Sequence, residues 1–182
     1  MINPIIYDFK IYNMLIFPLD EVKKMVIKIK KENINKINIY DCFYYYQNKK
    51  TSNKENKIFC KRCNQLTEFI NKYKLFNAPN ILIIILNRAK GDSYNIKIEF
   101  QEKMDITDYI QFKQNKVIYN LYSVVTHLGK NGEEGHFVAS CKNLIDNLWY
   151  KYNDSTIIKI DNIQKEVLNY GKPYILFYQK QN

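Results

Sequence analysis

The sequence lacks any long run of uncharged apolar residues. The longest one, residues 81–86, is typical of a single buried β-strand, whereas a membrane-spanning helix needs about 20 such residues. The first residues also lack a basic start followed by a long apolar block, which a secretory signal peptide would have. We therefore expect no membrane partner and an intracellular location, in the cytoplasm or the nucleus.

Cysteine is scarce, with four in 182 residues. Without a secretion signal, these few cysteines argue against a disulfide framework. Cys60 and Cys63 have the spacing of one half of a structural zinc site, but such a site needs four ligands. We therefore expect no cofactor, and zinc only if a second cysteine pair comes from outside this chain. Cys42 and Cys141 stand alone.

Arginine is nearly absent, because Arg62 and Arg88 are the only two among 28 basic residues; the formal net charge is +10. A charge of this size favours an anionic partner. Readers of nucleic acid usually use arginine for bases and phosphates, however, and the lysines here are scattered. We interpret the lysines as a solvated surface and expect no nucleic-acid partner. A basic nucleic-acid binder with half a zinc ribbon is the alternative.

Apolar residues make up 46% of the chain and aromatic residues 15%, enough for one domain with a core. Short apolar or alternating segments predict mainly strands. The expected strands are residues 14–18, 22–29, 67–76, 81–86, 94–100, 116–127, 135–142, 148–152, 157–160 and 173–179, and the expected helices are 37–47 and 163–169. The predicted fold is α+β, a mainly antiparallel sheet with few short helices, in which residues 81–86 are buried on both faces.

Both histidines of the chain lie in one stretch of the sequence. His136 follows a glycine-bearing loop and begins a strand-like segment, and Asn153 and Asp154 follow Trp149 near the end of the next segment. Neighbouring antiparallel strands can place such residues side by side. A histidine oriented by an amide or a carboxylate is two thirds of a catalytic triad. We predict a catalytic group here; the alternatives are a surface histidine and a plain Asn-Asp turn.

This stretch resembles the C-terminal half of the catalytic domain of ubiquitin-specific proteases, the papain-like cysteine deubiquitinases. The matched residues are Tyr119, Leu121, Val124, His127, Gly129, Gly135, His136, Phe137, Trp149, Tyr152, Asn153, Asp154, Ser155, Tyr174, Leu176 and Tyr178. The resemblance implies that residues 1–182 form the C-terminal part of such a domain. Residues 1–80, approximately, would be fingers-proximal, and about 81–182 would form the palm with the histidine motif.

The resemblance implies thiol-dependent hydrolysis of the peptide or isopeptide bond after the C-terminal glycine of ubiquitin. Ubiquitin or a ubiquitinated protein is therefore the expected partner. His136 would be the catalytic base. Asn153 would accept a hydrogen bond from His136, and Asp154 would help to polarise the imidazole or to position the oxyanion.

The family also threads the glycine-ended tail of ubiquitin through a narrow channel. The resemblance implies that Gly129, Gly132 and Gly135 border this channel, because glycine permits close backbone approach. A plain hairpin loop is the alternative interpretation. His127 would have a structural or tail-facing role.

The family's nucleophilic cysteine lies in a motif that precedes all of these residues, and residues 1–41 contain no match to it. The chain is therefore interpreted as part of an active deubiquitinase, as an inactive ubiquitin-binding or scaffold module, or as the unrelated nucleic-acid binder above. Cys42 precedes His136 and Asn153 in papain-like order. The resemblance nevertheless places Cys42 on a helix near the fingers, where we expect a buried structural cysteine.

Overall fold

The computed structural model describes residues 5–10, 14–32, 34, 36–48, 50–51, 57–88, 94–112, 115–130, 132 and 134–181. The helices are α1 (Leu19–Lys30), α2 (Ile39–Gln47) and α3 (Ile163–Tyr170), and Thr107–Tyr109 form a short 3-10 helix. The strands are β1 (Ile5–Lys10), β2 (Met14–Pro18), β3 (Lys36–Asn38), β4 (Lys50–Thr51), β5 (Ile58–Cys60), β6 (Gln65–Thr67), β7 (Ile70–Leu75), β8 (Ile81–Asn87), β9 (Lys97–Glu99), β10 (Lys103–Asp105), β11 (Ile118–Leu128), β12 (His136–Lys142), β13 (Trp149–Asn153), β14 (Thr156–Ile160) and β15 (Lys172–Lys180).

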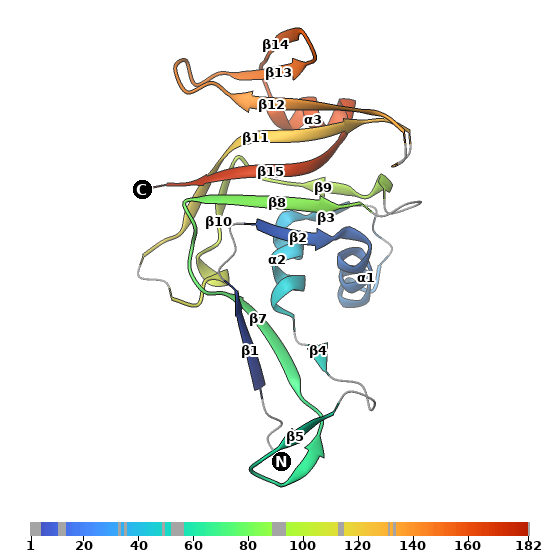
Figure 1. The fold of residues 1–182 in the computed structure, drawn as a ribbon. Helices are drawn as coiled ribbons and strands as arrows, with labels where there is room; N and C mark the ends of the chain where they lie inside the picture. The colour runs from blue at the N-terminus through green and yellow to red at the C-terminus, as the bar shows by residue number, and fades with distance from the viewer. Residues whose placement is uncertain are drawn as a thin grey trace.

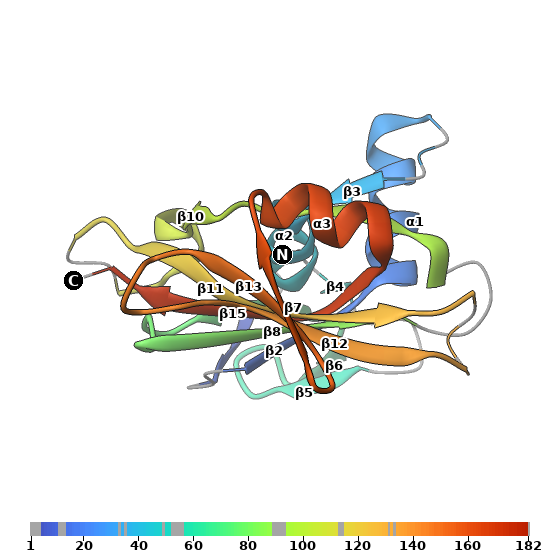
Figure 2. The same ribbon diagram turned by 90° about the horizontal axis from the view of Figure 1, so that it is seen from above.

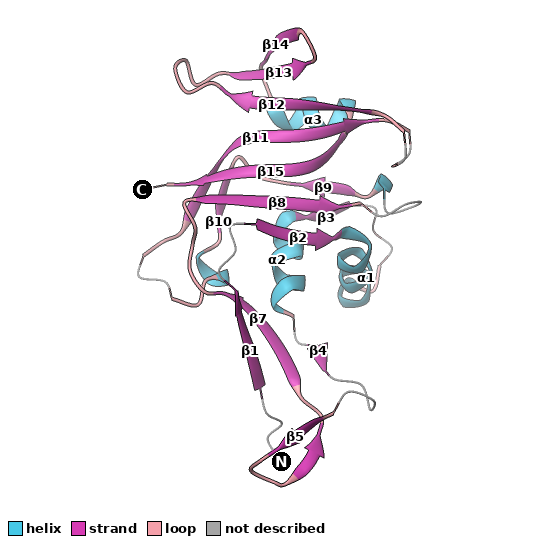
Figure 3. Ribbon diagram, in the orientation of Figure 1, coloured by secondary structure: helices cyan, strands magenta, loops and turns pink. Residues whose placement is uncertain are grey.

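One eight-stranded sheet organises the protein (Figure 1). Its strand order is β14-β13-β12-β11-β15-β8-β2, and β10 pairs with β11 beside this path. Neighbouring strands are antiparallel except for β2, which runs parallel to β8. Strands β1 and β7 extend away from this sheet toward the β5–β6 hairpin (Figure 3). The predicted α+β class is confirmed, although the pairs β1–β7, β2–β8 and β3–β9 are parallel.

The helices cover one face of the eight-stranded sheet (Figure 2). Strand β8 shows the consequence, because Leu82, Ile84 and Leu86 are at most 1% exposed, whereas the three isoleucines between and before them are only partly buried. The expectation that this strand is buried on both faces is therefore wrong. A strand with one helix-covered face buries alternate side chains.

Residues 22–29 belong to helix α1, so the predicted strand is wrong. Leu19, Val22 and Val26 are buried and have the spacing of one helix face. Acidic residues lie in the first turn of α1 and lysines in the last turn, as the helix dipole favours. The short run of alternating apolar residues and lysines fits both a strand and a helix, and packing against the sheet favours the helix.

Helix α2 confirms the helix expected at residues 37–47, and it begins at Ile39. The Asn38 side chain accepts a hydrogen bond from the Tyr40 amide at 3.0 Å, and the Asn38 amide donates to Asp41 Oδ2 at 2.8 Å. This reciprocal pair is a capping box, which satisfies amide groups that the first helical turn leaves free. Asn38 and Asp41 therefore fix where helix α2 begins.

We expect Ile84→Ala to lower the free energy of unfolding by about 2–5 kcal/mol, because it leaves a cavity in the core. Ile84 is 0% exposed. The matched control is Ile16→Ala on β2, where the side chain is 53% exposed and the loss should be below about 1 kcal/mol. Urea unfolding of the two variants measures both values. Equal losses would contradict a core on one face of the sheet.

Candidate functional site

His136 and Asn153 come together because their strands are antiparallel neighbours. His136 is the first residue of β12 and Asn153 is the last residue of β13. In the antiparallel register the start of β12 lies beside the end of β13. His136 Nε2 lies 2.6 Å from Asn153 Oδ1. The predicted adjacency of these two side chains is confirmed.

The contact with Asn153 determines where His136 carries its proton. An amide oxygen only accepts hydrogen bonds, so Nε2 carries the hydrogen and donates it to Asn153 Oδ1. In the neutral imidazole, Nδ1 therefore has the free lone pair. The His136 side chain is 45% exposed. A group with an acidic proton can approach Nδ1 from solvent and lose its proton there.

Asp154 lies close to His136 but does not share this contact. Its Oδ2 is 3.6 Å from His136 Nε2, which is beyond hydrogen-bond length, and its side chain is 80% exposed. Asp154 has a φ of 49° and begins the turn between β13 and β14, where Asn153 pairs with Thr156. Asn153 therefore orients the ring, and the Asp154 carboxylate contributes an attraction that water screens.

His127 lies beneath the glycine-bearing loop, near the end of β11, and is 4% exposed. Gly129 and Gly135 both approach its ring: a Cβ on Gly129 would lie 2.8 Å from His127 Cε1, and one on Gly135 would lie 2.4 Å from Nε2. Gly135 also has a φ of 155°, which glycine tolerates best. Gly132 has ordinary space, with 3.4 Å to the Tyr94 ring. Of the two predicted roles of His127, the structural one fits this burial.

The sequence profile of the ubiquitin carboxyl-terminal hydrolase family matches residues 12–178. The chain belongs to this family. The resemblance seen in the sequence is therefore confirmed, and with it the deubiquitinase class of cysteine peptidases.

Curated relatives in the family come from distant eukaryotes. Ubiquitin carboxyl-terminal hydrolase 12 of Saccharomyces cerevisiae is 28% identical, over 99% of this chain and 15% of the relative. Ubiquitin carboxyl-terminal hydrolase 5 of Arabidopsis thaliana is 28% identical, over 90% of this chain and 18% of the relative. Ubiquitin carboxyl-terminal hydrolase 2 of Gallus gallus is 25% identical, over 84% of this chain and 43% of the relative. The chain thus spans less than half the length of each.

Solved structures of family members have the same fold. A SAGA DUB module containing Ubp8, Sgf11, Sus1 and Sgf73 includes a chain with a TM-score of 0.64 and 27% identity, covering 81% of this chain and 35% of that one. A SAGA DUB module bound to monoubiquitin gives a TM-score of 0.62 at 27% identity, with the same coverage. This deubiquitinase-family chain therefore has the architecture of part of a known catalytic domain.

Among the described residues, no hydrogen bond joins His136 of this deubiquitinase-family chain to a cysteine. Cys42 is 0% exposed in the core, where burial strongly raises the pKa of its thiol. A thiol held in this protonated form is a poor nucleophile. Cys141 Sγ lies 3.2 Å from Ser123 Oγ. The expectation that Cys42 is a buried structural cysteine is confirmed.

Cys60 ends β5, and Cys63 lies within the turn between β5 and β6. The backbone amides of Cys63 and Arg62 point at Cys60 and lower the pKa of its thiol. Two sulfur ligands do not complete a tetrahedral zinc site. Within the described part of the chain, no cluster of three or more metal-ligating side chains exists. These residues alone therefore do not fit a closed zinc site.

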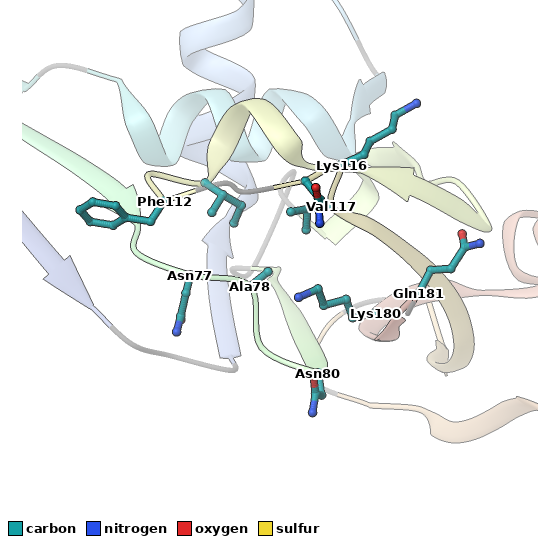
Figure 4. Close-up of a pocket in the computed structure, with 10 residues that line it drawn as sticks. Asn77, Ala78, Asn80, Phe112, Lys116, Val117, Lys180 and Gln181 are labelled. Carbon is teal, nitrogen blue, oxygen red and sulfur yellow. The ribbon is translucent and has the colours of Figure 1, made fainter.

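A cavity of about 580 Å³ lies away from the histidines (Figure 4). It is lined by Asn77, Ala78, Asn80, Ile110, Phe112, Asn115, Lys116, Val117, Lys180 and Gln181. Val117 precedes the start of β11 and Lys180 ends β15, whereas His127 pairs with Lys172 at the other end of both strands. The cavity is thus separate from the His136 site.

None of the helices in the described residues has both the length and the apolar character that a membrane span requires.

Sequence reasoning missed Tyr94 as a partner of the site. Tyr94 is 1% exposed and its hydroxyl lies 2.9 Å from His127 Nδ1. Arg88, one of the two arginines, is buried and donates a hydrogen bond to the Tyr94 carbonyl oxygen. No local pattern marks either role, because Tyr94 contacts His127 and Arg88 also donates to the Pro173 carbonyl oxygen, and both of these partners are distant in sequence.

We expect Asn153→Ala to abolish the fixed tautomer of His136, because the acceptor for Nε2–H is removed. Long-range proton–nitrogen spectra of the imidazoles report which nitrogen carries the proton. In the wild type, the neutral ring should be protonated at Nε2. Asp154→Asn is the matched control and should retain this tautomer, since Asp154 is beyond hydrogen-bond length. If Asp154→Asn loses the fixed tautomer and Asn153→Ala retains it, the carboxylate orients the ring.

We expect thiol alkylation to separate the cysteines by environment. Cys60 should react fastest because its pKa is lowered and its thiol is accessible. Cys42 should react only on unfolding, because it is 0% exposed. Mass spectrometry after timed alkylation, with a urea-unfolded control in which all four react, measures this order. Rapid labelling of folded Cys42 would contradict the buried position.

Proposed function

We propose that this chain supplies the base-bearing half of a deubiquitinase active site, which hydrolyses the peptide or isopeptide bond after the C-terminal glycine of ubiquitin. The observation that carries this proposal is the 2.6 Å contact between an exposed His136 and Asn153. Family membership supports the reaction class. A related SAGA DUB module bound to monoubiquitin supports ubiquitin, free or attached to a protein, as the ligand.

In the proposed reaction, His136 Nδ1 takes the proton of a cysteine thiol, and the thiolate adds to the carbonyl carbon of the scissile bond. The imidazolium then gives this proton to the departing amine, which leaves a thioester. Nδ1 next takes a proton from water, whose oxygen attacks the thioester and breaks the C–S bond. The leaving thiolate takes this proton back from the imidazolium, and the carboxylic acid that forms loses its remaining proton to solvent. Asn153 keeps Nε2–H engaged, so that Nδ1 faces the reacting atoms throughout. Asp154, whose Oδ2 lies 3.6 Å from Nε2, would help to polarise the imidazole.

The thiol in this scheme belongs to a segment outside these 182 residues. Cys42 is buried, Cys60 and Cys63 lie at the β5–β6 turn, and Cys141 contacts Ser123. The donors that stabilise the oxyanion would come mainly from residues near that nucleophile. Gly129, Gly132 and Gly135 would border the channel for the ubiquitin tail, as the family resemblance implies. The close packing of Gly129 and Gly135 on His127 leaves no space for a Cβ at either position.

The same cysteine positions favour one second candidate function. Without a thiol beside His136, the chain would be a catalytically inactive module that binds ubiquitin or serves as a scaffold. With either candidate, we expect no nucleic-acid partner and no cofactor. Zinc would enter only with a second cysteine pair from outside. The intracellular location, in the cytoplasm or the nucleus, remains a prediction.

We expect ubiquitin to shift the amide resonances of Gly129, Gly135 and His136 in the isotope-labelled chain. Ubiquitin without its two terminal glycines is the matched control and should leave these resonances in place, because only the tail would enter the channel. The measurement is a titration followed by proton–nitrogen correlation spectra. If intact ubiquitin shifts none of the three resonances, the proposed tail site is wrong.

Labelling with ubiquitin that carries a thiol-reactive C-terminus distinguishes the two candidate functions. Binding without an adduct indicates a chain that needs an external nucleophile or is inactive, and addition of a nucleophile-bearing upstream segment then separates these two. An adduct on Cys42 that disappears in His136→Ala would show a complete site within these residues, against the buried position of Cys42. Mass spectrometry locates the modified cysteine.

A further inference from the structure

Tyr94 and His127 form a buried polar pair beneath the loop that precedes His136. The Tyr94 side chain is 1% exposed and that of His127 is 4% exposed. The Tyr94 hydroxyl lies 2.9 Å from His127 Nδ1 and donates to the carbonyl oxygen of Gly129 at 2.8 Å. One hydroxyl thus contacts both the end of β11 and the first residue of the loop.

The hydrogen-bond count determines the tautomer of His127. A tyrosine hydroxyl has one hydrogen, and here it is directed to the Gly129 carbonyl. The hydroxyl oxygen must therefore accept from His127, so Nδ1 carries the hydrogen and Nε2 has the lone pair. His136 has the opposite tautomer, with its hydrogen on Nε2. The two histidines of the chain are thus held in different forms by different partners.

The loop packs directly on the other edge of the His127 ring. A Cβ on Gly135 would lie 2.4 Å from Nε2 and 2.5 Å from the Leu128 carbonyl oxygen, so the backbone is as close as glycine allows. The rings of Phe137 and Tyr174 lie 4.7 Å and 5.5 Å from the His127 ring. His127 is therefore enclosed by residues on both sides of His136 in the sequence.

Arg88 holds Tyr94 from behind. Its side chain is 6% exposed, and Nη1 donates to the carbonyl oxygens of Tyr94 at 3.0 Å and of Ile96 at 2.6 Å. Nε donates to the Pro173 carbonyl oxygen at 2.9 Å, which attaches the same guanidinium to the start of β15. The Tyr94 main chain is therefore fixed against the sheet, and its phenol extends from this anchor to the loop.

We propose that Tyr94 and His127 are positioning residues that hold Gly129 and Gly135 in place and thereby set the approach of His136 to the ubiquitin tail. His136 follows Gly135 directly, and Leu128 pairs with His136 in the β11–β12 register. A displacement of Gly135 away from His127 would move the His136 backbone and, with it, Nδ1. The effect on the ubiquitin tail rests on the function proposed above, whereas the effect on the loop does not.

Tyr94→Phe tests the proposal because it removes one hydroxyl and retains the buried ring. Tyr178→Phe is the matched control: Tyr178 is 0% exposed, its hydroxyl donates to the Gln101 carbonyl at 2.8 Å, and it lies near the other end of β15. Both variants lose one buried hydroxyl-to-carbonyl hydrogen bond. Tyr94→Phe also loses the bond that its hydroxyl accepts from His127 Nδ1, so exchange in the two variants is compared at the same global stability, set with urea.

We expect Tyr94→Phe to speed amide hydrogen exchange at Gly129, Gly135 and His136 by about fivefold to tenfold, the factor for losing one buried hydrogen bond. Tyr178→Phe should leave these amides within about twofold of the wild type, at matched global stability from urea unfolding. Equal exchange at the three amides in the two variants would overturn the proposal.

The imidazole nitrogen spectrum reports the tautomer of each histidine ring, which a loss of global stability alone would not change. The chain has two histidines, so two rings contribute. In the wild type and in Tyr178→Phe, His127 should be protonated at Nδ1 and His136 at Nε2. Tyr94→Phe should give His127 a mixture of tautomers. A wild-type His127 protonated at Nε2 would overturn the proposal without any substitution.

The ubiquitin titration separates this inference from the proposed function. Faster exchange in Tyr94→Phe, together with about fivefold weaker ubiquitin binding than in Tyr178→Phe, supports both. If the wild type fails to bind ubiquitin but the exchange and tautomer results hold, the proposed function fails and the loop contact stands. If ubiquitin binds both variants equally, the positioning role toward the tail is wrong.

Discussion

The register between β11 and its neighbours is the constraint on which the rest of the structure depends. β11 has 11 residues and pairs with β10, β12 and β15. Pairing of Leu128 with His136 determines where the loop closes, and the β12–β13 register then brings Asn153 beside the imidazole. A shift by one residue would turn His136 to the opposite face of the sheet, away from Asn153. The candidate site is therefore a consequence of backbone hydrogen bonding across three strands.

Two sets of buried hydrogen bonds, one made by Arg88 and one by Tyr94, stabilise the end of the sheet at which His127 lies. The Arg88 guanidinium binds three carbonyl oxygens, and the Tyr94 hydroxyl reaches both His127 and Gly129. Such groups are expensive to bury without partners, so each contact strongly favours one arrangement of its neighbours. In the exposed pair of His136 and Asn153, His136 follows directly after Gly135, which packs against His127. In our proposal, the geometry of this pair depends on these buried residues.

Several elements were readable from local sequence because their signals are local. The capping box of α2 lies within four residues, and the short apolar segments that became β11, β12 and β13 were expected as strands. Helix α1 was misjudged because alternating apolar residues and lysines satisfy both periods over a few residues. Strand β8 was expected to be buried on both faces, but a run of isoleucines does not reveal that the helices cover one face only.

The sequence by itself determined the family, the mainly antiparallel α+β class and the candidate residues His136, Asn153 and Asp154. These follow from motifs that are contiguous or lie on consecutive strands. Only the tertiary structure decided that Asp154 lies beyond hydrogen-bond length of the imidazole, that the Arg88 guanidinium is anchored to Pro173, and that the Tyr94 hydroxyl reaches both His127 and the Gly129 carbonyl oxygen. The reason is physical: these facts depend on distances between side chains of separate elements, which are set by strand register and packing and leave no periodicity in the chain.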